Sequence, residues 1–139
     1  MKVVVIGSGG REHALCETLK KSHNVNKIYC MPGNAGTNLI AENIEIQIND
    51  FEKIKKISIE KKIELLVIGP EKPLVDGISD YFKNTNIKIF GPNKIASKLE
   101  GSKTFTKKLC KKYNIPTSKF DIFENKKDAK KFLSNSIFP

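Results

Sequence analysis

The chain has 139 residues, of which 39% are hydrophobic, and 25 lysine and arginine residues against 15 acidic residues give a formal net charge of +10. A chain of this length can bury one core without a disulfide framework or a structural metal, and its patterned apolar runs exclude intrinsic disorder. The apolar run at residues 3–6 is far shorter than the roughly 20 residues of a membrane span, so a cytoplasmic protein without membrane contacts is expected.

Short apolar runs alternate with helical patterns over the first hundred residues. Strands are predicted at 3–6, 27–30, 44–48, 65–68 and 87–90, the third from the alternation of Ile44, Ile46 and Ile48 with polar residues. Helices are predicted between them from apolar pairs at three- or four-residue spacing: Leu15 with Leu19, Ile54 with Ile57, and Ile78 with Phe82. This order predicts an α/β fold, a Rossmann-like parallel sheet covered on both faces.

The pattern changes after Gly101, and the balance of charge changes with it. Residues 1–101 carry 15 basic and 12 acidic side chains, whereas residues 102–139 carry 10 and 3. Two domains are therefore expected, 1–101 and 102–139, and the second is expected to be truncated because its last element has only begun. Its predicted elements are a helix through Phe105, Leu109 and Tyr113 that ends at Asn114, a strand at 119–123, a helix at 126–133 and the start of a strand at 137–139.

The excess of basic residues raises nucleic acid as a partner, because lysine and arginine neutralise phosphates regardless of base sequence. However, 24 of the 25 basic residues are lysines, and they occur on every predicted helix. Solvated helix faces explain them better, so no nucleic-acid partner is expected. The three cysteines, Cys16, Cys30 and Cys110, lack metal-ligand spacing and are interpreted as buried reduced thiols.

The first predicted strand leads directly into Gly7-Ser8-Gly9-Gly10-Arg11, and a helix follows. Glycines let backbone N–H groups approach an anion, and the start of a helix adds the positive end of its dipole. The loop also holds the only arginine of the chain, whose guanidinium can bind phosphate bidentately. A phosphate-binding loop is predicted, the alternative being a plain strand-to-helix turn. A dinucleotide loop would need glycine in place of Glu12, and a Walker A loop would need glycine in place of Ser102.

Three more loops follow predicted strands at their carboxyl ends, where open parallel sheets bind ligands. They are residues 32–37, 69–74 and 91–93, and all four loops are expected to converge on one crevice. The second of these three contains Glu71 between two prolines, which are expected to hold the acid rigidly. Its carboxylate could accept hydrogen bonds from sugar hydroxyls or an amine, and an acid favoured by a helix N-terminus explains it equally well.

Neither histidine has a nucleophile at a fixed spacing, so no catalytic residue is assigned. His13 is interpreted as packing against its helix or supporting the site, with direct ligand contact as the alternative, and His23 as a surface residue. Lys103 opens a predicted helix, where a cation opposes the helix dipole unless an anion is near.

Taken together, the loops resemble those of one family, glycinamide ribonucleotide synthetase, also called phosphoribosylamine-glycine ligase, in the ATP-grasp superfamily. The resemblance extends over nearly the whole chain, with one small departure at Lys72, where the family usually has a small residue. It is carried by four ordered motifs: Val5-Ile6-Gly7-Ser8-Gly9-Gly10-Arg11-Glu12-His13-Ala14-Leu15, Pro32-Gly33-Asn34-Ala35-Gly36-Thr37, Gly69-Pro70-Glu71-Lys72-Pro73-Leu74-Val75, and Phe90-Gly91-Pro92 followed by Leu99-Glu100-Gly101-Ser102-Lys103.

The resemblance implies the second step of purine biosynthesis. In that reaction ATP phosphorylates the carboxylate of glycine, and the amine of 5-phosphoribosylamine attacks the glycyl phosphate to give glycinamide ribonucleotide, ADP and phosphate. The implied cofactors are ATP and Mg²⁺ or Mn²⁺, and the implied partners are small molecules only, with a monomeric protein. On this basis Gly9, Gly10 and Arg11 would hold the 5′-phosphate, and Asn34 and Glu71 would face the ribose or the amine.

The resemblance also assigns supporting residues, and it implies that part of the ATP site is missing from this chain. Lys103 resembles the first ATP-phosphate lysine of the superfamily, and Ser8, His13, Gly36 and Pro70 would support the substrate site. The glycine-rich ATP loop and the metal-binding acids are expected beyond Pro139, so the 139-residue chain by itself is expected to be inactive. The alternative is a Rossmann-like module that binds a phosphosugar or nucleic acid without catalysis.

Overall fold

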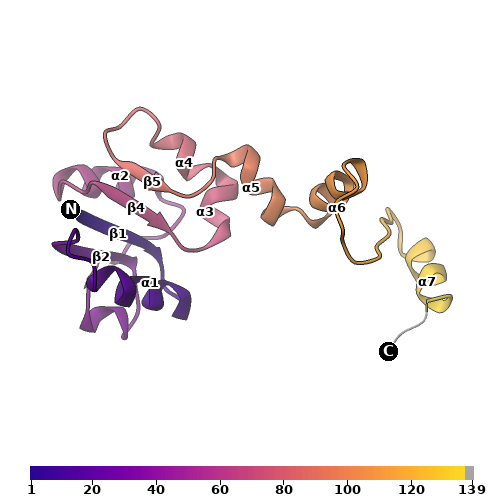
Figure 1. Ribbon diagram of the computed structural model, residues 1–139, viewed down its shortest axis with the longest axis horizontal. Coiled ribbons are helices and arrows are strands. Elements are labelled where there is room, and N and C mark those ends of the chain that lie inside the picture. The colour runs from indigo at the N-terminus through magenta and orange to yellow at the C-terminus, as the bar shows by residue number, and fades with distance from the viewer. Residues whose placement is uncertain (137–139) are drawn as a thin grey trace. The chain divides into compact units, whose positions relative to one another are not determined.

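The computed structural model describes residues 1–136 and divides into two compact units, residues 1–101 and a second unit that begins at Ser102 (Figure 1). The first unit is built on a five-stranded parallel sheet with the strand order β3-β2-β1-β4-β5. The strands are β1 (Lys2–Gly7), β2 (Lys27–Pro32), β3 (Glu42–Asn43), β4 (Leu65–Ile68) and β5 (Lys88–Phe90). The predicted α/β class with a parallel Rossmann-like sheet is therefore confirmed.

Hydrophobic clusters cover both faces of this sheet because alternate side chains of β1 point to opposite sides. Val4 and Ile6 belong to a cluster with Ile54 and Phe82, whereas Val3 and Val5 belong to a second cluster with Cys16. The first unit holds the helices α1 (Gly10–Lys20), α2 (Phe51–Glu60), α3 (Glu71–Asp76), α4 (Ile78–Tyr81) and α5 (Lys94–Gly101), and a 3₁₀ helix, η1 (Thr37–Leu39).

The predicted strand at 44–48 is wrong. Strand β3 comprises only two residues and ends at Asn43, and the chain leaves the sheet after the Ile44 N–H donates to the Cys30 carbonyl at 2.9 Å. Ile46 is nevertheless buried in the core, with Ile48 packed against the same cluster. The alternating isoleucines thus reflect a segment that runs over the edge of the core, without the ladder of hydrogen bonds that a strand needs.

The second unit contains helices α6 (Lys103–Lys112) and α7 (Lys126–Ser134), which confirm the two helices predicted there. The predicted strand at 119–123 is wrong, because these residues are in extended or irregular backbone without a ladder. The Lys107 ammonium binds the preceding stretch instead, donating to Thr117 Oγ1 at 2.6 Å and Ser118 Oγ at 2.7 Å. The strand start predicted at 137–139 lies outside the described residues.

Cys16 and Cys30 are buried free thiols as predicted, whereas the expectation of burial is wrong for Cys110, which is only half-buried. The pKa of the Cys16 thiol is raised because it hydrogen-bonds with Cys30 and is buried. Among residues 1–136, no helix combines the length and the apolar character that crossing a bilayer requires.

Replacement of Ile54 by alanine should lower the free energy of unfolding by about 2–5 kcal/mol, because the fully buried side chain leaves a cavity in the core. Ile59→Ala on the same helix is the matched control, since Ile59 is 56% exposed, and its effect should stay within about 0.5 kcal/mol. Urea denaturation followed by circular dichroism measures both values. Equal losses in the two variants would contradict the placement of the core.

The Glu42 carboxyl should titrate below its ordinary range, because hydrogen bonds from Lys61 and Lys27, each at 3.0 Å, lower its pKa. A lowered pKa in the folded state means that the stabilisation is present at neutral pH and is lost as the pH falls through that pKa. NMR titration of the Glu42 carboxyl carbon measures this pKa. Lys61→Met should raise the pKa, whereas Lys56→Met, which removes an exposed lysine from α2, should not.

Candidate functional site

The loops after β1, β2 and β4 meet at the carboxyl edge of the sheet because these strands are neighbours in it. They enclose a pocket of about 240 Å³, lined by Gly7, Ser8, Gly9, Glu12, Pro32, Gln47, Ile48 and Pro70. The loop after β5 does not line it: Pro92 borders a separate pocket with Glu71 and Leu74. Three of the four predicted loops therefore converge, and the fourth belongs to a neighbouring apolar hollow.

The centre of the site is the carboxylate of Glu12, which the sequence did not single out as a functional group. Glu12 is in the first turn of α1, only 4% exposed, and its Oε2 accepts the Gly9 N–H at 2.6 Å. Its Oε1 has no hydrogen-bond partner among the described residues. Gly9 precedes α1 and Glu12 follows three residues later, which is the spacing of a capping box. This spacing could have predicted the contact from the sequence.

The glycines of two loops surround this side chain. A Cβ at Gly7 would lie 2.6 Å from Glu12 Cγ, a Cβ at Gly9 would lie 2.9 Å from Oε2, and a Cβ at Gly69 would clash with Oε1. Gly7 also has a φ of +128°, which side chains disfavour. The prediction of a phosphate-binding loop at residues 7–11 is thus corrected in part, because Gly7 and Gly9, together with Gly69 from another loop, make room for the carboxylate of Glu12.

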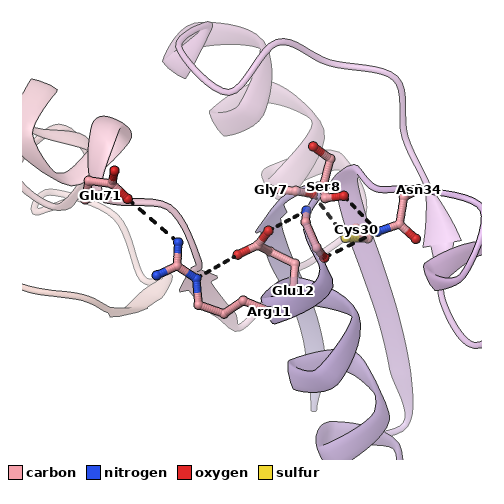
Figure 2. A network of polar contacts seen from close by, with 8 residues as sticks. Gly7, Ser8, Arg11, Glu12, Cys30, Asn34 and Glu71 are labelled. Atoms are coloured by element: carbon pink, nitrogen blue, oxygen red, sulfur yellow. Dashed lines mark hydrogen bonds and ion pairs between the residues drawn. The ribbon is translucent and has the colours of Figure 1, made fainter.

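Arg11 lies between two carboxylates. Its Nε is 3.4 Å from Glu12 Oε1 and one terminal nitrogen is 3.7 Å from Glu71 Oε2, as Figure 2 shows. The Arg11 side chain is 60% exposed, so a ligand can reach it from solvent. The N–H groups of Gly10 and Arg11 also lack helical acceptors, since the first helical bond of α1 runs from His13 to the Gly9 carbonyl.

Asn34 ties the second loop to the first. Its Nδ2 donates to the Ser8 carbonyl at 2.8 Å and to the Gly9 carbonyl at 3.3 Å, and its Oδ1 accepts the Thr37 N–H at 2.9 Å. The amide nitrogen is therefore bound to two carbonyl oxygens of the first loop (Figure 2). The predicted contact of Asn34 with ribose could be made only through Oδ1.

His13 supports the same junction from α1. A Cβ at Gly36 would lie 2.6 Å from His13 Cε1, so the imidazole packs where only glycine leaves room. Its Nε2 lies 3.9 Å from Glu17 Oε1, one turn further along the helix. This geometry favours packing, the first of the two interpretations given to His13, and His23 is exposed as expected.

Glu71 is the first residue of α3, with Pro70 preceding the helix and Pro73 in its first turn, so the predicted loop at 69–74 is a helix from Glu71 onward. A carboxylate at this position is stabilised by the dipole of the helix, as the alternative interpretation supposed. The side chain is 52% exposed, and its partner is Arg11. Lys103 belongs to the second unit, where it is the first residue of α6. The residue before it, Ser102, caps this helix: its hydroxyl accepts the Phe105 N–H.

Gln47 and Ile48 were missed because they belong to the segment that was predicted to be a strand. Their place on the pocket follows from that segment leaving the sheet edge, for which the sequence carries no local signal. Within residues 1–136, no group of three histidine, cysteine, aspartate or glutamate side chains is arranged to hold a metal ion.

The fold and these loops define a Rossmann-like domain whose ligand site lies at the carboxyl edge of a parallel sheet. A family model described as "Phosphoribosylglycinamide synthetase, N domain" matches residues 1–100. The chain belongs to this family, as the resemblance of its loops predicts.

Named relatives agree with this assignment. The chain is 48% identical to phosphoribosylamine–glycine ligase of Caldanaerobacter subterraneus and 42% identical to that of Clostridium acetobutylicum, over all 139 residues in both cases. It spans 33% of the length of each, or about a third. The crystal structure of phosphoribosylamine–glycine ligase from Thermotoga maritima superposes with a TM-score of 0.69 at 32% identity, covering 96% of this chain and 30% of that one.

Replacement of Asn34 by aspartate should lower the free energy of unfolding by about 1–3 kcal/mol, because a carboxylate would face two carbonyl oxygens without a proton to donate. Asn38→Asp is the control, as Asn38 is an exposed residue of η1, which follows the same loop. Thermal and urea denaturation measure the difference. If both variants unfold at the same denaturant concentration, the Asn34 contacts do not stabilise the junction.

Proposed function

We propose that this chain is the substrate-binding domain and the beginning of the ATP domain of a phosphoribosylamine–glycine ligase, with the domain boundary at residue 101. In the complete protein, the amine of 5-phosphoribosylamine is joined to glycine with the hydrolysis of ATP. The observation that carries the proposal is the start of α1, where the Arg11 guanidinium faces the half-exposed carboxylate of Glu71 and the N–H groups of Gly10 and Arg11 have no helical acceptor. A ligand with both a phosphate and an amine matches these opposite charges.

The 5′-phosphate is assigned to the Gly10 and Arg11 N–H groups and to the Arg11 guanidinium, which can form two parallel hydrogen bonds with it. Gly9 does not donate to the phosphate, because its own N–H donates to Glu12. Its assigned part is to shape the backbone of the loop. Glu71 is assigned to the ribose hydroxyls or the amine. Ser8, Asn34, His13, Gly36 and Pro70 hold the loops that carry these groups.

The chemistry requires activation of glycine, since a free carboxylate is a poor electrophile and phosphate is a good leaving group. ATP supplies that phosphate, and a divalent metal, Mg²⁺ or Mn²⁺, neutralises and orients the ATP phosphates when it is bound. The described residues do not form a metal centre of their own. The part of this chain in the reaction is to bind and orient the amine substrate, and Lys103 is assigned to an ATP phosphate.

The inactivity of the 139-residue chain by itself, its monomeric state, its cytoplasmic location and the absence of nucleic-acid partners stay predictions of the sequence. The non-catalytic alternative is distinguished by salt. Binding to nucleic acid through many phosphates collapses between low and physiological salt, whereas a pocket for one phosphate loses much less affinity.

Calorimetric titration with glycinamide ribonucleotide at physiological salt tests the proposal. Arg11→Ala should weaken binding about 10- to 100-fold, because a charge-assisted pair of hydrogen bonds to phosphate is lost. The matched control is Lys20→Ala, which removes one positive charge from the other end of α1 and should leave the affinity unchanged. An absence of binding by the folded unmodified chain, or an equal loss in both variants, would refute the assignment of the phosphate to Arg11.

A further inference from the structure

We propose that Glu12 determines which phosphates this site accepts, by acting as a built-in anion that closes the glycine loop to pyrophosphate and leaves room for one phosphate monoester at Gly10 and Arg11. The part of this inference that concerns the monoester rests on the proposed function. The exclusion of pyrophosphate does not, because it follows from the contacts of Glu12 alone.

The first observation is the occupied donor. Glycine loops of dinucleotide-binding folds use their backbone N–H groups at the start of a helix to bind pyrophosphate, with glycine at the position that Glu12 has here. In this chain the Gly9 N–H instead donates to Glu12 Oε2 at 2.6 Å. An external phosphate oxygen would have to displace a carboxylate of the same helix to reach that N–H.

The second observation is the occupied space. Glu12 fills the volume that Gly7, Gly9 and Gly69 leave open, and a single added carbon at any of the three would come within 2.9 Å of its side chain. A phosphate group is much larger than one carbon atom. On the side where a Cβ would point, these glycines therefore hold the Glu12 side chain and leave no room for a phosphate.

The third observation is that the buried Glu12 carboxylate must share its cation. Glu12 Oε1 is buried without a hydrogen bond and faces Arg11 Nε at 3.4 Å. Arg11 is shared with Glu71, so one cation serves two carboxylates before any ligand arrives. A ligand phosphate near Oε1 would be repelled by a charge that water cannot screen, which directs the phosphate to the exposed side of Arg11.

NMR spectroscopy of the unmodified chain tests the position of the phosphate. With ribose 5-phosphate as the probe, the backbone amide signals of Gly10 and Arg11 should shift and that of Gly9 should not. With inorganic pyrophosphate, the Gly9 signal should again stay in place. A Gly9 shift as large as that of Gly10 with either probe would overturn the proposal.

Substitution tests the cause. Glu12→Ala should raise the affinity for inorganic pyrophosphate about tenfold or more, because it frees the Gly9 N–H and the space beside it. Glu12→Gln should show no gain, since the amide oxygen still accepts the Gly9 N–H and fills the same volume. Glu17→Ala removes an exposed acid from the same helix and controls for net charge. A gain in either control equal to that of Glu12→Ala, or a folded Glu12→Ala without a gain, would overturn the proposal.

The outcomes separate this inference from the proposed function. If ribose 5-phosphate and glycinamide ribonucleotide fail to bind while Glu12→Ala gains pyrophosphate affinity, the proposed function fails and the exclusion by Glu12 stands. If both bind at Gly10 and Arg11 but pyrophosphate shifts the Gly9 amide, the exclusion fails and the proposed function stands. The NMR experiment needs no substitution, so it decides the matter even if Glu12→Ala does not fold.

Discussion

The hydrogen bond between the Glu12 carboxylate and the Gly9 N–H organises the carboxyl edge of the sheet. It caps the first turn of α1 and places a buried negative charge at the point where the loops after β1 and β4 meet. The absence of side chains at Gly7 and Gly69 is what allows both loops to close on that carboxylate. Arg11 then faces Glu12 on one side and Glu71 on the other, so its position also depends on this contact.

The sheet order supplies the rest of the arrangement. Because β1 lies between β2 and β4, its loop can be fixed from both sides, by Asn34 after β2 and by Glu71 after β4. His13 packed on Gly36 adds a second connection between α1 and the loop after β2. The groups that can meet a ligand are thus held by elements that are themselves buried in a two-sided core.

Elements with strong local signals could be predicted from the sequence, and those that depend on distant partners could not. The runs at 3–6 and 65–68 are strands because they are apolar throughout and lie at the centre of the sheet. The isoleucines at 44–48 alternate with polar residues as they would in a strand. Their alternation reflects contact with the hydrophobic core and not pairing with a strand of the sheet. In the site, the glycines and Arg11 were found from their local spacing. The role of Glu12 was missed: its contact with Gly9 follows the spacing of a capping box, whereas its contact with Gly69 depends on a loop that is distant in the sequence.

The fit of Glu12 among three glycines has an evolutionary consequence. A side chain at Gly69 would collide with the carboxylate, and a shorter residue at position 12 would leave a void and an unpaired Gly9 N–H. Each change alone should lower the stability of the domain, although a combination of the two could restore the packing. Substitutions at these positions should therefore be strongly epistatic, and descendants of this domain should keep or exchange the four residues as a group.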